Sequence, residues 1–275
     1  MKTVGKGKDN RMKLLISPAK KMRVDTDTME PQGLPVFLAQ AQELMEWMRG
    51  KSEEELKTLW ACSDRLAGQN VKRLKEMSLT ERLTPAILSY EGIQYQYMAP
   101  VVFEETQWKY VQEHVRILSG FYGFLKPLDG VTPYRLEMQA KGGPKGNLYD
   151  FWGSRIYEAL SAETDCIVNL ASKEYAACIE PYLPKVQKDG KKPLRYITCI
   201  FGEECPQNGR KGLPVVQKGT LAKMARGEMI RFAAENQLQT PEGLQRFNRL
   251  GYLFRPEYSD AARYVFTAPK ANRTF

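Results

Sequence analysis

The sequence predicts a mixed α/β (α+β) fold in a single compact domain. Short apolar segments typical of buried strands alternate irregularly with longer segments in which apolar residues recur at helical spacing. The 275-residue chain contains no internal repeat and no Pro/Ser-rich linker that would separate two domains. We expect one domain over residues 12–268, a disordered extension or expression remnant over residues 1–11, and a tail over residues 269–275.

The first half of the chain is predicted to be mainly helical after one strand. Pro18 stops that strand, and Lys20 and Lys21 follow it on a loop. Ser52 and Glu55 form the capping box of a helix. The elements expected here are a buried strand over residues 12–17, packing helices between 35 and about 77, a helix-compatible segment at 85–88 and an amphipathic helix over 104–117.

The second half is predicted to alternate strands and helices. Gly120 and Gly123 lie three residues apart in an apolar run and indicate a tight turn. Ser172 fits the N-cap of a helix, and Thr240 with Pro241 begins the last helix. The expected elements are helices near 149–160, after 172, over 218–236 and from 241, strands over 166–170, 195–201, 252–254 and 264–267, and an exposed loop at 141–146.

The positive charge is concentrated near the carboxyl terminus. The net charge is +9, and residues 185–275 hold 17 Lys and Arg against 8 Asp and Glu, whereas residues 1–184 are balanced. A localised positive field attracts polyanions, of which nucleic acid is the most abundant in a cytoplasm. No segment is long and apolar enough for a membrane helix or a signal peptide, so we expect a cytoplasmic protein.

Several classes of chemistry find little support in the residues. The five cysteines are scattered without a C-x-x-C pair, which argues against a disulfide framework and a zinc site. A single histidine, His114, makes most metal sites and Ser-His or Cys-His mechanisms improbable. No P-loop, Rossmann or H-E-x-x-H motif occurs. We therefore expect no metal and no organic cofactor.

A set of short motifs runs through the chain in a fixed order. They are ISPAKK (16–21), LSGFYG (118–123), PLD (127–129), PYRLEM (133–138), NLYDFW (147–152), NLASKEY (169–175) and Ala225-Arg226-Gly227. Together they resemble the YaaA family of bacterial peroxide stress proteins over residues 12–266. The resemblance implies a family-specific fold with a positively charged cleft, a helix-hairpin-helix element, and binding to double-stranded and branched DNA. It also implies a role in limiting iron- and peroxide-dependent damage.

The first functional hypothesis is a DNA-binding protein without sequence specificity. In a helix-hairpin-helix turn, backbone N–H groups freed by glycines contact phosphate oxygens without reading bases. On the residues alone, a packing turn without a ligand is an equal alternative for Gly120 and Gly123. The predicted DNA-binding residues are Lys20, Lys21, Lys126, Arg135, Lys223, Arg226 and Arg231 in the cleft, and Ser119, Gly120, Tyr122 and Gly123 in the turn.

Two other hypotheses remain open. A DNA-processing lyase or hydrolase would use Lys20 as nucleophile with Asp129 and Glu137 as acid or base. Carboxylates beside Lys and Arg are more often ion-pair partners, so a non-enzymatic protein comes first. An iron-sequestering protein would have to rely on carboxylates. Protein partners in DNA repair are compatible with the resemblance, which does not identify them.

Overall fold

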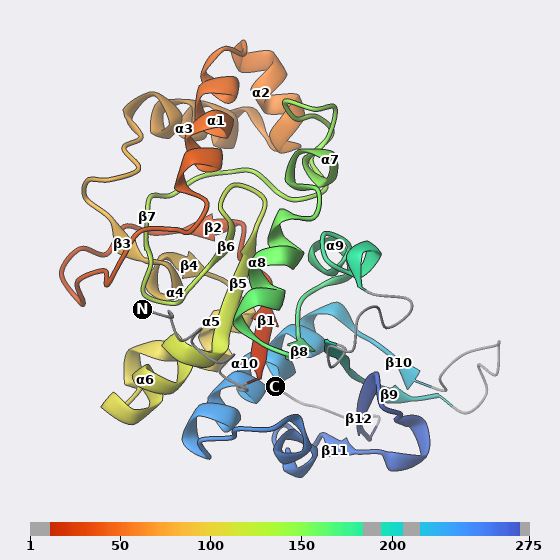
Figure 1. Cartoon of the computed structure of the whole chain (residues 1–275). Coiled ribbons are helices and arrows are strands. Elements are labelled where there is room, and N and C mark those ends of the chain that lie inside the picture. Colours follow the sequence, from red (N-terminus) through yellow and green to blue (C-terminus); the bar gives the residue numbers. More distant parts are fainter. Residues whose placement is uncertain (1–11, 184–193, 206–214, 270–275) are drawn as a thin grey trace, which may run out of the picture.

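A computed structural model of the chain describes residues 12–183, 194–205 and 215–269 (Figure 1). In spatial order, its main sheet contains β11 (Leu253–Phe254), β12 (Arg263–Ala268), β9 (Arg195–Glu204), β8 (Cys166–Asn169), β1 (Lys13–Ile16), β5 (Val115–Ser119) and β6 (Gly123–Leu125), while β10 (Val215–Val216) pairs with β9. The five strands from β12 to β5 are parallel, and β6, β10 and β11 pair antiparallel with their neighbours. The predicted mixed α/β fold is confirmed.

The two central strands are short, and all their residues except Lys13 and Asn169 are apolar. Every residue of β1 and β8 is buried, as expected of parallel strands covered on both faces. From β1 the chain proceeds to β5 on one side, returns to place β8 on the other side of β1, and continues outward through β9 and β12. The direction of winding therefore reverses between β1 and β8, and a crevice is expected outside the carboxyl ends of two such strands.

Three helices form a lobe beside the sheet, at the top of Figure 1. They are α1 (Leu38–Arg49), α2 (Glu53–Trp60) and α3 (Asp64–Glu76). The predicted capping box begins α2, because the Glu55 N–H donates to Ser52 Oγ at 3.2 Å and the Ser52 N–H donates to a Glu55 carboxylate oxygen at 2.8 Å. The predicted helical segment between residues 35 and 77 is confirmed.

A second group of helices packs around α10 (Gly219–Glu235), which confirms the helix predicted over residues 218–236. Its neighbours are α5 (Ile93–Met98) and α6 (Glu105–His114). Gly227 lets α10 approach α5 closely, because a Cβ at this position would lie 2.1 Å from the Gln94 carbonyl oxygen. No side chain fits at that distance, so the glycine determines how the two helices meet.

The remaining elements are short. The segment predicted as one helix near residues 149–160 is two helices separated at Gly153, whose φ is +51°. The helix predicted from Pro241 is a 3-10 helix. The short α-helices are α4 (Ala86–Ser89), α7 (Leu148–Trp152), α8 (Arg155–Glu163) and α9 (Lys173–Ala176). The 3-10 helices are η1 (Pro100–Val102), η2 (Glu180–Tyr182), η3 (Pro241–Arg246) and η4 (Pro256–Tyr258). Two short strand pairs join β2 (Lys21–Met22) with β4 (Tyr90–Glu91) and β3 (Thr84–Pro85) with β7 (Gly130–Val131).

The amphipathic helix predicted over residues 104–117 is wrong at its carboxyl end. Helix α6 ends at His114, and Val115 begins β5. Val115 and Ile117 pair with Leu14 and Ile16 of β1. All five residues of β5 are buried, so pairing within the sheet outweighs their compatibility with helical spacing.

The helix-hairpin-helix placement at residues 118–123 is also wrong. These residues form the turn of an antiparallel β-hairpin between β5 and β6. Ser119 Oγ accepts the N–H groups of Phe121 at 3.2 Å and Tyr122 at 2.9 Å. Gly123 has a φ of +70°, and a Cβ on Gly120 would lie 2.6 Å from the Leu136 carbonyl oxygen. The turn packs within the core, as the alternative interpretation predicts.

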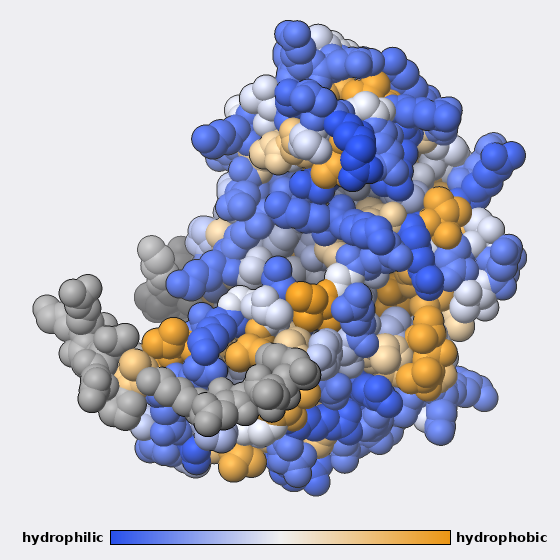
Figure 2. All heavy atoms as spheres, turned by 180° about the vertical axis from the view of Figure 1, so that it is seen from behind, coloured by the Kyte–Doolittle hydropathy of each residue, from blue (hydrophilic) through white to orange (hydrophobic). Residues whose placement is uncertain are grey.

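The extension predicted over residues 1–11 and most of the predicted tail, residues 270–275, lie outside the described ranges. Within the described part of the chain, no helix is long and apolar enough to cross a membrane. The face seen in Figure 2 is mostly hydrophilic, with hydrophobic residues in small groups. All five cysteines are free, and Cys166, Cys178 and Cys199 are buried.

Candidate functional site

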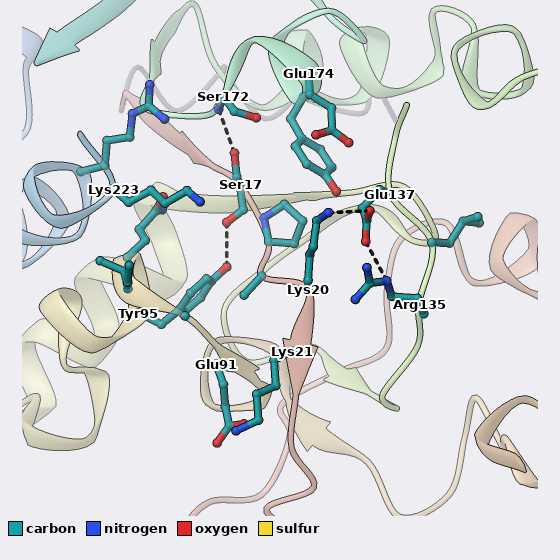
Figure 3. Close-up of a pocket in the computed structure, with 18 of the residues that line it drawn as sticks. Ser17, Lys20, Lys21, Glu91, Tyr95, Arg135, Glu137, Ser172, Glu174 and Lys223 are labelled. Atoms are coloured by element: carbon teal, nitrogen blue, oxygen red, sulfur yellow. Dashed lines mark hydrogen bonds and ion pairs between the residues drawn. The ribbon is translucent and has the colours of Figure 1, made fainter. Parts of the chain in front are cut away.

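A pocket of about 470 Å³ lies at the carboxyl ends of β1 and β8, where the winding of the sheet reverses (Figure 3). We call it the β1–β8 pocket. Segment 17–21 follows β1, Ser172, Glu174 and Tyr175 follow β8, and the other lining residues come from β4 and α5, the 134–137 segment, and α10. The place matches the crevice that this topology predicts.

Ser17 connects three of these segments. Its Oγ accepts the backbone N–H of Ser172 at 2.8 Å, and its carbonyl oxygen accepts the Tyr95 hydroxyl at 3.0 Å (Figure 3). The loops after β1 and β8 are thereby tied to each other and to α5. Pro18, directly after Ser17, further limits the backbone of the lysine-bearing loop.

Glu137 joins two predicted basic residues on one side of the pocket. One carboxylate oxygen lies 3.1 Å from Lys20 Nζ, and the other lies 2.9 Å from Arg135 Nε. The Lys20 side chain is 65% exposed, whereas those of Arg135 and Glu137 are mostly buried. Lys20 therefore reaches outward from a carboxylate that Arg135 holds in place. At the rim, Lys21 Nζ lies 2.7 Å from Glu91.

Helix α10 supplies the other cationic side of the pocket. Lys223 is exposed, forms no ion pair with any residue that the structure describes, and lies across the pocket from Lys20 and Glu137 in Figure 3. Arg226, one turn further along α10, is partly buried, and burial lowers the pKa of its guanidinium. The lining thus contains five cationic side chains against the carboxylates of Glu91, Glu137 and Glu174.

Glu174 has the most perturbed carboxylate of this pocket. Burial raises its pKa, and the negative charge of Glu137 raises it further, whereas Lys20 and the N–H of Gln139 lower it. The Gln139 N–H donates to a Glu174 carboxylate oxygen at 3.3 Å. This carboxylate is therefore one that can accept or release a proton close to Lys20.

The structure brings five of the predicted DNA-binding residues and Glu137 together and leaves six of the DNA-binding set elsewhere. Ser119, Gly120, Tyr122 and Gly123 are buried in the core, and Arg231 pairs with Glu235 at 2.9 Å on α10. Because these four residues are buried, neither their backbone nor their side chains are exposed to a phosphate, and the structure gives them a packing role. Those lining the β1–β8 pocket are Lys20, Lys21, Arg135, Glu137, Lys223 and Arg226.

Asp129 and Lys126 also lie outside this pocket. Asp129 is buried, and its carboxylate accepts the Lys126 N–H at 2.8 Å. Burial raises the pKa of Asp129 to about 6, although the Lys126 N–H and Arg116 oppose this shift. The predicted grouping of Asp129 with Lys20 and Glu137 is wrong, because Asp129 closes a turn between β6 and β7.

The positive charge predicted to concentrate in residues 185–275 lies partly outside the described ranges. Eight of the 17 cationic residues after position 184 lie outside the described ranges. Most of the others are paired with carboxylates, as Arg195 is with Glu242 and Lys218 with Glu203. The described part of the chain also has no group of three or more His, Cys, Asp or Glu side chains arranged to hold a metal ion.

The sequence analysis missed Ser17, Gln94, Tyr95, Ser172 and Glu174 as pocket residues. Ser17 directly follows β1, and Ser172 lies three residues after the end of β8, so their shared position after a buried strand was a usable signal. It becomes informative only once β1 and β8 are known to be neighbours.

The family model and the relatives found by comparison each match this chain over most of its length. A family model described as peroxide stress protein YaaA matches residues 12–258. A protein of Agathobacter rectalis named "UPF0246 protein" is 54% identical over 257 residues, which is 93% of this chain and 98% of the relative. UPF0246 proteins of Lachnoclostridium phytofermentans and Limosilactobacillus reuteri are each 49% identical, over 95% and 94% of this chain and 98% and 100% of their own lengths.

Proposed function

Since this chain belongs to the family of the peroxide stress protein YaaA, we propose that it acts in the peroxide stress response by binding DNA at the β1–β8 pocket. The observation that carries this proposal is the convergence of five cationic side chains, from three separate segments, on one pocket at the switch point of the sheet. Binding there limits oxidative, iron-dependent damage to double-stranded and branched DNA.

The arrangement favours contact with the phosphate backbone. Lys20, Lys21 and Lys223 are exposed at the pocket, and lysines contact phosphates as point charges. Ion pairs with glutamates hold Lys20 and Lys21 in place, while Lys223 has no such pair among the described residues. Phosphate contacts carry no sequence information, so binding is non-specific.

The test is the salt dependence of binding. Each phosphate that the protein neutralises contributes about −0.9 to the slope of log affinity against log salt on duplex DNA. We expect a slope of roughly −3 or steeper for the full-length chain on duplex and four-way-junction DNA. A slope near zero, or no binding at low salt, contradicts the proposal.

A DNA-processing enzyme is the second candidate, and the contact between Lys20 and Glu137 favours it. If Glu137 takes a proton from Lys20, the neutral amine can add to the aldehyde carbon of an abasic sugar, and loss of water then gives a Schiff base. Asp129 takes no part, because it lies outside the pocket. Product formation from abasic DNA by the wild-type protein would place this candidate first.

A further inference from the structure

The wall of the β1–β8 pocket formed by α5 and α10 holds two buried donors without acceptors. Gln94 is only 6% exposed, and its Nε2 has no hydrogen-bond partner. Arg226 lines the same pocket, and its buried Nε also has none. A buried donor that has lost its water and found no acceptor destabilises the folded state. Two such groups on one wall indicate that the pocket is built to receive acceptors.

Arg226 also lacks a counter-ion among the residues that the structure describes. Of the three pocket carboxylates, Glu91 pairs with Lys21, Glu137 pairs with Lys20 and Arg135, and Glu174 accepts the N–H of Gln139. Cys199 interacts electrostatically with Arg226, but burial raises the pKa of this thiol to about 12, so it is neutral at pH 7. A guanidinium stays protonated in proteins. A partly buried cation with a buried, unpaired Nε and no carboxylate partner among the described residues suits an anionic ligand group.

The rest of the lining suits a flat, uncharged group attached to that anion. Tyr95, Tyr134 and Tyr175 all line the pocket. The Tyr95 hydroxyl donates to Ser17, and the Tyr134 hydroxyl bonds with those of Tyr90 and Ser119, so ring surface is what Tyr95 and Tyr134 can offer a ligand. Aromatic rings and an amide donor are how proteins hold an unstacked base. About 470 Å³ is within the size range of small-molecule sites.

We propose that the β1–β8 pocket binds one nucleotide, with its phosphate at Arg226 and its base at Gln94 and the tyrosine rings. The nucleotide has two chemical sources: a free nucleoside monophosphate, or a nucleotide that has left the stack of a DNA strand. The second source rests on the proposed DNA-binding function, and the first does not. Lys223, exposed on α10 one turn before Arg226, contacts the next phosphate of a strand.

The first experiment is calorimetric titration of the full-length protein with dAMP, dCMP, inorganic phosphate and deoxyadenosine. Both nucleotides are expected to bind more tightly than either fragment, because only they occupy both halves of the pocket. Arg226→Met is expected to weaken dAMP binding roughly 10- to 100-fold. Gln94→Met is expected to weaken it roughly 3- to 10-fold while leaving inorganic phosphate unaffected.

Thermal unfolding separates this role from a structural one. Arg226→Met removes an uncompensated, partly buried charge, so the unliganded variant is expected to unfold at a higher temperature than wild type. A lower unfolding temperature together with unchanged dAMP affinity overturns the proposal. Should Arg226→Met not fold, Gln94→Met and Arg226→Lys apply the same binding test. Lys72→Ala, on the distant helix α3, is the control and should change neither measurement.

Duplexes that contain 2-aminopurine at a mismatch distinguish the two sources, because fluorescence rises when this base leaves the stack. A rise with wild type that Arg226→Met abolishes identifies the strand nucleotide as the ligand. Binding of dAMP without such a rise identifies the free nucleotide. Salt-dependent duplex binding with no nucleotide binding and no rise overturns the inference and leaves the proposed function standing. Nucleotide binding without duplex binding overturns the proposed function and leaves the inference standing.

Discussion

The Ser17 hydroxyl accepts the backbone N–H of Ser172 at 2.8 Å, across 155 positions of sequence. This bond joins the loops that follow β1 and β8, and both loops line the pocket. Ser17→Ala leaves the Ser172 N–H unpaired, so we expect a loss of about 1 kcal/mol in the free energy of unfolding in urea. DNA affinity should fall as well, because the loop carrying Lys20 is less restrained.

Ser63→Ala provides the control for this prediction. Ser63 is the N-cap of α3 but makes no side-chain capping bond, and it lies in the helical lobe. The variant should leave DNA affinity unchanged. Equal DNA affinity of Ser17→Ala and wild type would show that the loop connection does not position the binding residues.

Lys20 distinguishes a phosphate contact from a nucleophile. Its Nζ lies 3.1 Å from the Glu137 carboxylate and projects outward. Lys20→Arg should keep duplex affinity within about twofold, while Lys20→Ala should lose roughly 1 kcal/mol, about a fivefold change. Abasic-DNA cleavage is measured in parallel. Cleavage by wild type that both variants lose, with binding intact in Lys20→Arg, would favour the enzyme, because a guanidinium cannot attack.

Asp129 gives the protein a pH-dependent contribution to stability. Burial raises the folded-state pKa of Asp129 to about 6, whereas the unfolded value is about 3.9. The folded state therefore favours the protonated form, so the stabilising contribution is complete below about pH 4 and is lost as pH rises through 6. Asp129→Asn removes this dependence.

The measurement is the free energy of unfolding of wild type and Asp129→Asn between pH 4 and 7. The value for wild type minus that for the variant should fall by up to roughly 3 kcal/mol over this range. Taking the difference cancels the other titrating groups. A difference that does not change with pH would show that Asp129 is not held in its neutral form.

Gly120 tests whether the turn after β5 contacts DNA or only packs. A Cβ at this position would lie 2.6 Å from the Leu136 carbonyl oxygen, which is backbone and cannot swing away. Gly120→Ala should therefore cost about 1–3 kcal/mol of stability. At a temperature where the variant remains folded, its duplex affinity should equal that of wild type. A folded variant that no longer binds DNA would restore the turn as a contact.

The strands and helices that the sequence predicted well are those with one dominant pattern. β1 and β8 are uninterrupted buried runs, and α10 is a long helix between clear boundaries. β5 was missed because Val111, Val115 and Leu118 also satisfy helical spacing, and pairing with β1 decides between the two structures. A local sequence pattern contains no information about β1, the partner strand, which lies far from β5 in the sequence.

The candidate site was predicted in part. Lys20, Lys223 and Arg226 were identified from charge and motif, and the structure places all three in one pocket. Gln94 was missed because an amide side chain on a short helix carries no local signal; only the contact between α5 and α10 places it in the same pocket as Arg226. Gly120 was assigned to phosphate binding because a glycine turn looks the same in sequence whether it packs or binds.

The most direct test of the account compares two single-charge variants in duplex binding at fixed salt. Lys223→Ala and Lys72→Ala each remove one exposed positive charge from a helix, but only Lys223 lines the β1–β8 pocket. By fluorescence anisotropy on a short duplex, we expect Lys223→Ala to bind roughly five- to tenfold more weakly, with a salt slope about 1 unit shallower, and Lys72→Ala to stay within about twofold of wild type. Equal losses in both variants, or none in Lys223→Ala, would contradict the assignment of DNA binding to this pocket.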